Sequence, residues 1–241
     1  MKKILFIYLI LMISCSDFQE REQILDYKEY LYQGWNAFET VNLDQLSQDS
    51  TNAYYYQLAL DMFDVSALAI DYEFISQNLV GPHYKSYNGI AWTQLYYANE
   101  FLTPDLHNIR DSLRQEAEIF FNKAIDNFNS HSSNLNLLSQ DKCDTYCGLS
   151  YVYYYNNLND LSLINSSKLI DECENYNFQH DEIDYRNIHY LRGKIHLLQD
   201  DYNQACTEIS QAIDCNCIDS DANIDVNILL NCFDEFANGN E

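Results

Sequence analysis

The chain has 241 residues and a formal net charge of −24, with 13 Lys and Arg against 37 Asp and Glu. This charge excludes binding to nucleic acid through a general basic field. Aromatic residues make up 15% of the sequence, too large a share for a disordered acidic tail. Only 6 Gly and 2 Pro favour helices over a protein of sheets and turns.

The N-terminus has the pattern of a secretion signal. Residues 1–3 are basic, and residues 4–13 form an apolar run that is too short to span a bilayer as a mature helix. A small residue, Ser14, then precedes Cys15. The segment Met12-Ile13-Ser14-Cys15 resembles the cleavage box of a bacterial lipoprotein signal peptide.

This resemblance implies a signal peptide over residues 1–14, a lipid on Cys15 and a polar tether over residues 15–26. We therefore expect a lipid-anchored protein of the bacterial cell envelope, and Ser16 in place of an acidic residue favours the outer membrane. Cleavage removes two lysines, so the mature chain is more acidic still and is repelled by anionic lipid surfaces. An ordinary secreted protein and an uncleaved anchor are the alternatives.

A glycine recurs within helix-like apolar segments beyond the tether, at Gly34, Gly89, Gly148 and Gly193. Downstream of three of these glycines, a small residue is followed by a bulky one at helical spacing. These segments are Ala59-x3-Phe63, Ala117-x3-Phe121-x2-Ala124 and Ala205-x3-Ile209-x2-Ala212. Residues 163–173, after Gly148, are only amphipathic. Glycine and alanine let two helices approach closely, and bulky residues fill the space between them.

Glycine, alanine and a bulky residue in this order resemble the tetratricopeptide repeat, TPR. The resemblance implies an all-α protein, a TPR-like solenoid of antiparallel helix hairpins. We expect about four irregular hairpins over residues 27–218, followed by a C-terminal capping helix and tail over residues 219–241. The glycines lie further apart than the 34 residues of the standard repeat, so we expect longer helices or inserted loops.

In TPR proteins the first helix of each repeat lines a concave face, and the resemblance carries this role to matching positions. Eight of them form the candidate partner-binding groove: Lys28, Trp35, Phe38, Gln94, Lys142, Tyr153, Tyr190 and Lys194. Aromatic rings with a few lysines would suit an extended or helical peptide that carries some acidic groups. For Trp35 and Tyr153, burial in the core is an equally open alternative.

Seven cysteines follow Cys15, all in the C-terminal half: Cys143, Cys147, Cys173, Cys206, Cys215, Cys217 and Cys232. An oxidising envelope compartment favours disulfides, and an odd number leaves at least one thiol over. We expect Cys215 or Cys217 to pair with Cys232, and Cys147 to pair with Cys173. The alternative is that most of them are small buried hydrophobic residues.

The sequence has no Gly-rich phosphate loop, no G-x-S-x-G and no H-E-x-x-H, so we expect neither an enzyme nor a cofactor. His180-Asp181-Glu182 is interpreted as a solvated loop rather than a weak metal site. Asp219-x-Asp221-x-Asn223-x-Asp225 resembles the start of a calcium loop, but Ile224 stands where that loop requires glycine. Capping of the last helix is the favoured interpretation of these residues.

Together these features predict a membrane-anchored TPR-like scaffold for protein–protein interaction at the bacterial cell envelope, acting as an adaptor or assembly factor. The partner is a protein or peptide whose identity the sequence does not give. The alternative is a glycan-binding or small-molecule-binding lipoprotein associated with outer-membrane uptake, which an aromatic groove with Asn and Gln would serve.

Overall fold

The computed structural model describes residues 26–43, 51–75, 77, 79–101, 106–131, 140–218 and 223–239. The predicted signal peptide, Cys15 and almost all of the tether lie outside the described residues. Within the described ranges the chain forms nine α-helices, one π-helix and no β-strand, which confirms the all-α fold class. None of the described helices is both long and apolar enough to cross a membrane.

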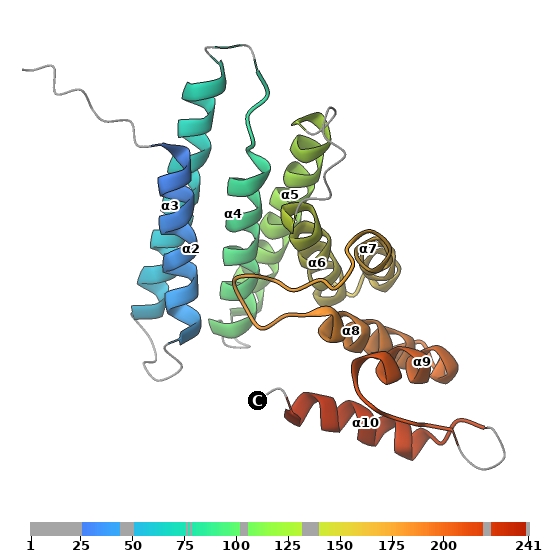
Figure 1. The fold of residues 1–241 in the computed structure, drawn as a ribbon. Helices are drawn as coiled ribbons and strands as arrows, with labels where there is room; N and C mark the ends of the chain where they lie inside the picture. The colour runs from blue at the N-terminus through green and yellow to red at the C-terminus, as the bar shows by residue number, and fades with distance from the viewer. Residues whose placement is uncertain are drawn as a thin grey trace, which may run out of the picture.

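The helices follow one another along the chain as Figure 1 shows. They are α2 (Tyr27–Leu43), α3 (Thr51–Ile75), α4 (Tyr84–Tyr96), the π-helix η1 (Tyr97–Phe101), α5 (His107–His131), α6 (Gln140–Tyr155), α7 (Asn159–Glu172), α8 (Tyr185–Leu198), α9 (Tyr202–Ala212) and α10 (Val226–Gly239).

Consecutive helices pack as antiparallel hairpins: α2 with α3, α4 with α5, α6 with α7, and α8 with α9 (Figure 1). In the first hairpin, the hydroxyl of Ser66 near the end of α3 donates a hydrogen bond of 3.0 Å to the carbonyl of Tyr27 at the start of α2. Neighbouring hairpins contact each other in chain order, and α10 packs against α9. The result is a linear stack of hairpins, with each helix beside its sequence neighbours.

The glycines that mark the hairpins make room for aromatic rings. A methyl group added at Gly34 or at Gly89 would overlap the ring of Phe63, and one added at Gly148 would overlap the ring of Phe121. Phe63 therefore packs between the first helix of its own hairpin and the first helix of the next. Both rings are fully buried, so at each of these glycines the helix backbone packs directly against a core side chain.

Gly193 packs differently from the other three. Its nearest neighbours are the ring of Phe233 in α10 and the backbone carbonyl of Ala205 in α9. The close approach of α8 and α9 through Gly193 and Ala205 confirms the sequence-based expectation for this pair. The last glycine thus joins its hairpin to the C-terminal helix.

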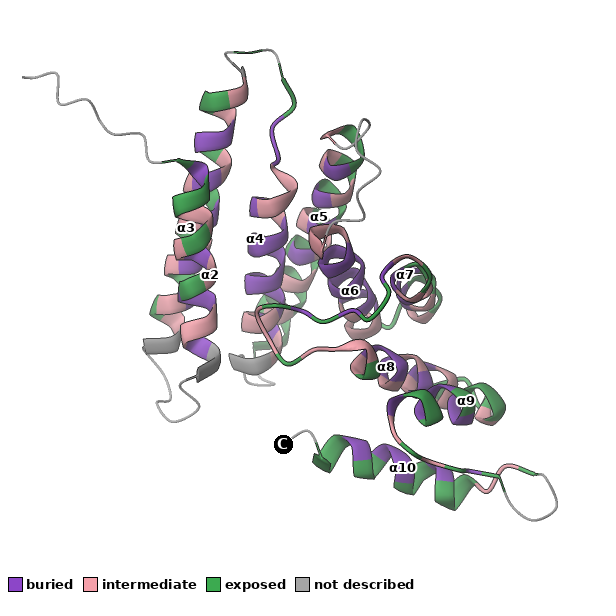
Figure 2. Cartoon of the chain, in the orientation of Figure 1, coloured by how far each residue is buried: buried purple, intermediate pink, exposed green. Residues whose placement is uncertain are grey.

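Two main buried clusters follow from this packing, and Figure 2 shows buried residues along the inward faces of the helices. The larger cluster runs from Ala37 in α2 to Ile188 in α8. The smaller one lies between α9 and α10 and includes Leu229, Phe233 and Phe236. Since these apolar residues share one side of α10, burying that stripe holds the last helix on the stack.

Candidate functional site

The connection between α7 and α8, residues 173–184, forms a finger that leaves the stack and returns to it. In Figure 1 it runs from α7 across to α4 before it returns to the start of α8. At its tip, His180 reaches Glu39 in α2, which is 141 residues away in sequence. The finger therefore joins the first hairpin to the last two, over the first helices that the TPR resemblance assigns to the concave face.

The tip of the finger is held by a stacked pair of rings and a carboxylate. The ring of His180 lies flat on the ring of Trp35, with centroids 3.7 Å apart and planes at 2°. Its Nδ1 is 2.6 Å from Oε1 of Glu39. Burial lowers the pKa of His180, and the hydrogen bond to Glu39 offsets only part of that effect.

Two residues earlier, Phe178 fills the space between the two tryptophans of the chain. Its ring stacks on Trp92 with centroids 4.4 Å apart, and it meets Trp35 edge-on at 6.1 Å. Phe178 and Trp92 are almost completely buried. Burial of the Phe178 ring against Trp92, and its contact with the half-buried Trp35, hold the finger on the stack.

Both ends of the finger are fixed to the stack. Cys173 at its start forms a disulfide with Cys143 in α6. Asp184 at its end accepts hydrogen bonds from the first backbone N–H groups of α8 and forms a capping box with Asn187. Within the finger, the backbone N–H of Phe178 donates to the carbonyl of Ile183 at 2.8 Å. The finger is thus an ordered, hairpin-like loop.

In the first two hairpins, the structure brings together only part of the predicted groove. Trp35 is half-buried beneath His180, and Phe38 lies edge-on to it at 5.5 Å but is fully buried. Gln94 is also buried, and its amide donates to Glu116 at 2.9 Å. Lys28 is exposed near the start of α2, away from the finger.

In the last two hairpins, Lys142 is paired with Glu172 at 2.6 Å, and Tyr153 is buried. Tyr190 stacks on Phe236 of α10, and Lys194 lies 5.1 Å from the Tyr190 ring. Tyr190 and Lys194 therefore lie together, but beside the C-terminal helix and not beside Trp35.

Three of the eight predicted groove residues, Phe38, Gln94 and Tyr153, thus pack inside the protein in this structure. The TPR positions assume an open concave face, whereas here neighbouring side chains cover these residues. Sequence reasoning missed the contacts of Phe178 and His180. The interpretation of His180 as part of a solvated loop is wrong, because its ring is stacked on Trp35 and keeps only 20% of its exposure. The length of the connection and the aromatic-x-histidine spacing in Phe178-Gln179-His180 were the available signals.

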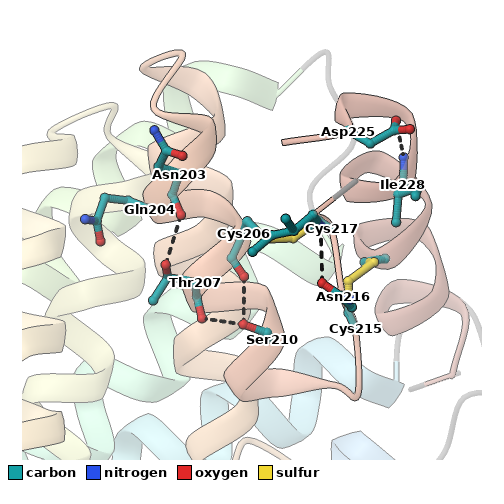
Figure 3. The surroundings of a disulfide bond; sticks show 12 residues. Asn203, Gln204, Cys206, Thr207, Ser210, Cys215, Asn216, Cys217, Asp225 and Ile228 are labelled. Atoms are coloured by element: carbon teal, nitrogen blue, oxygen red, sulfur yellow. Dashed lines mark hydrogen bonds between the residues drawn. A yellow bond between two sulfur atoms is a disulfide. The ribbon is translucent and has the colours of Figure 1, made fainter. Parts of the chain in front are cut away.

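The described cysteines form three disulfides. Cys215–Cys232 confirms one of the two pairings expected for Cys232, and Cys206–Cys217 ties α9 to the segment before α10 (Figure 3). Beside these bonds, Ser210 donates to the carbonyl of Cys206 (Figure 3). The C-terminal helix is therefore linked to α9 through two adjacent bridges.

The expected pairing of Cys147 with Cys173 is wrong. Cys173 is instead bonded to Cys143, which lies one helical turn before Cys147. Cys147 is a buried free thiol, and burial raises its pKa. A buried thiol with a raised pKa is protonated and inert as a nucleophile.

Two further polar clusters are buried, and both serve packing. Glu208 in α9 accepts hydrogen bonds from His189 at 2.6 Å and from Arg192 at 2.8 Å, both in α8. Burial alone would raise the pKa of Glu208, but these two partners lower it. Asp144 in α6 accepts from the amide of Gln140 at 2.9 Å, and burial raises its pKa to about 7.

Among the described residues, no three or more His, Cys, Asp or Glu side chains are placed to hold a metal ion. Asp225 accepts hydrogen bonds from the backbone N–H groups of Asn227 and Ile228, so it caps α10 (Figure 3). Asp219 and Asp221 of the calcium-like segment lie outside the described residues.

Comparison of the chain with protein-family models, curated proteins and solved structures gives no match. Inference about its function therefore rests on the chemistry of its own residues.

Proposed function

We propose that the chain is a TPR-like scaffold that binds a protein partner at the bacterial cell envelope, with a lipid on Cys15 as its anchor and α10 as the cap of the solenoid. The observation that carries the proposal is the stack of antiparallel hairpins with glycine–aromatic contacts between them. Helical arrays of this kind expose long surfaces and bind other proteins through them.

The envelope location is supported by the cysteines. Three disulfides in the described residues fit an oxidising compartment, which a chain with a lipoprotein-like signal would enter. The net charge of −24 opposes contact with anionic lipid, so the lipid on Cys15 would hold the protein at the membrane. A binding role is favoured over a catalytic one because Asp144 and Cys147, whose pKa values burial raises, are buried within the helices.

The experiment that tests this proposal is crosslinking of the full-length protein in cells, followed by purification under denaturing conditions and mass spectrometry. We expect one dominant protein partner, lost in Trp35→Ala and retained in Ile119→Ala, a control in which an exposed apolar side chain of α5 is truncated. Absence of any partner above background in the wild type would count against the scaffold.

Glycan or small-molecule binding is the second candidate. It is favoured by the exposed tyrosine rings of the first hairpin, at Tyr32, Tyr54 and Tyr72. Sugars stack on such rings, whose hydroxyl groups also donate hydrogen bonds. A soluble glycan that raises the melting temperature of the wild type, and raises it less in Tyr72→Ala, would support this candidate over the first.

A further inference from the structure

The finger is longer than its place in the chain requires. It joins α7 to α8, which already contact each other, and connections in helical bundles usually take about 2–8 residues. The twelve residues from Cys173 to Asp184 instead run to the first hairpin and back (Figure 1). Long ordered loops in compact folds usually carry a function.

Two side chains near the tip of the finger, Phe178 and His180, face the helices beneath it. Residues 179–180 form a turn and residues 181–182 a bend, so the turn at the tip, rather than an extended backbone, brings both rings to the same side. We call the surface that they cover, formed by Trp35, Glu39 and Trp92, the groove. One enters the space beside Trp92, and the other covers the face of Trp35. The groove thus accepts an aromatic ring followed, two residues later, by a flat nitrogen-bearing group.

A planar cation would fit the position of the His180 ring better than the imidazole does. The face of a tryptophan attracts a cation, and a guanidinium can stack on it while donating to a carboxylate. Trp35 and Glu39 are placed for both contacts. His180 uses only part of this attraction, because burial lowers its pKa and so disfavours the charged ring.

The finger also leaves the site imperfectly filled. The indole N–H of Trp92 is buried and has no acceptor among the described residues, which disfavours the occupied state. At the other end of the site, the side chains of His180 and Glu39 retain 20% and 42% of their exposure. An incoming segment can therefore compete first at the His180 end, where solvent reaches the contact.

We propose that this groove docks a turn of a partner protein that carries an aromatic residue and, two residues later, an arginine or histidine, and that the finger occupies the groove in the free protein. The partner segment complements the Glu39 carboxylate and the negative charge of the chain. The inference rests on the proposed scaffold function. Only molecules in which the finger is displaced can bind the partner. The apparent affinity for the partner is therefore reduced in proportion to the fraction of such molecules.

The test uses the full chain and a fluorescently labelled peptide with the sequence of residues 175–183 carrying His180→Arg. A peptide that also carries Phe178→Ala is the control ligand. The proteins are wild type, His180→Ala, which weakens the finger at its solvent-exposed end, and His107→Ala, a control at an exposed histidine of α5. Fluorescence anisotropy measures binding. Because Trp35 and Trp92 are the only tryptophans of the chain, their emission reports on the groove.

We expect His180→Ala to bind the arginine peptide about tenfold more tightly than wild type and His107→Ala do, and to lose about tenfold in affinity when Glu39→Gln is added. If His180→Ala keeps its helical circular dichroism but binds both peptides equally weakly, the docking site is refuted. If that variant does not fold, wild type with excess peptide decides: a saturable change in tryptophan emission supports the site, and no change refutes it.

The peptide result and the crosslinking result separate the two proposals. A partner that is captured in cells but not displaced by the arginine peptide upholds the scaffold and refutes this docking site. Peptide binding to the groove upholds the docking site, whether or not crosslinking yields a partner for the scaffold.

Discussion

The two ends of this molecule are held together by different means. From α2 to α5 the chain has no cysteine, and its helices pack through glycines against buried aromatic rings in one continuous core. From α6 onward three disulfides join the elements. Cys143–Cys173 lies within the same large core, whereas the other two bridges lie in the smaller, separate core beneath α9 and α10. A small core cannot offset the entropy of its chain alone, so covalent links that restrict the unfolded state take over.

The largest effect should come from the aromatic ring that joins the first two hairpins. Phe63→Ala removes a fully buried side chain that contacts both Gly34 and Gly89, and we expect a loss of about 3–5 kcal/mol in the free energy of unfolding. Denaturant unfolding followed by circular dichroism measures it, with the exposed Ile119→Ala as control. A loss equal to that of the control would contradict the role of the ring as the joint between hairpins.

Removal of the last disulfide should act on the other end. Cys215→Ser with Cys232→Ser opens a bridge across 17 residues, for which we expect a loss of about 3 kcal/mol. Hydrogen exchange should rise in α10 and α9 and stay unchanged from α2 to α5. Equal loss of protection in both regions would show that they unfold as one unit and would contradict the separate stabilisation of the two ends.

A smaller loss of stability is expected where an aromatic ring packs directly against a glycine. Gly148→Ala places a methyl group against the ring of Phe121, and overpacking of this kind costs about 1–3 kcal/mol. Thermal unfolding should show a fall of roughly 2–4 °C for each kcal/mol. Gly239→Ala is the control, because a methyl group there meets no other atom. Equal melting temperatures for the two variants would refute the close packing at Gly148.

The last effect concerns the dependence of stability on pH. The pKa of Asp144 is about 7 in the folded chain against an ordinary 3.8, so the folded state keeps a proton that the unfolded state has released. This contribution to stability is therefore full below about pH 4 and is lost as the pH rises to about 7. Since one pKa unit corresponds to about 1.4 kcal/mol, we expect Asp144→Asn to gain up to about 4 kcal/mol relative to wild type between pH 4 and pH 7.5. Parallel stability curves for the two proteins would contradict the raised pKa.

Local packing was the part of the structure that the sequence could predict. The small–bulky spacing at Ala59 and Phe63 identified a buried ring, and Gly193 with Ala205 identified a close helix pair, because both depend on residues within one hairpin. The apolar pattern also predicted a final helix within residues 219–241, where α10 lies.

Contacts between distant segments could not be predicted in this way. Cys143 and Cys147 lie one turn apart on the same helix, so spacing alone cannot decide which of them reaches Cys173. The pairing of His180 with Glu39 spans 141 residues, and no local pattern encodes it. That same finger packs over Trp35, which repeat positions alone would place in an open groove.

The most direct test of the account is native-state hydrogen exchange of the finger in the wild-type protein, at the backbone amides of Phe178 and Tyr185, which donate hydrogen bonds to Ile183 and Tyr176. If the finger can leave the groove while the helices stay folded, these two amides exchange well before the buried amides of α4 and α6. Exchange of all these amides together, only on global unfolding, would show that the finger is a permanent part of the core and would contradict the account.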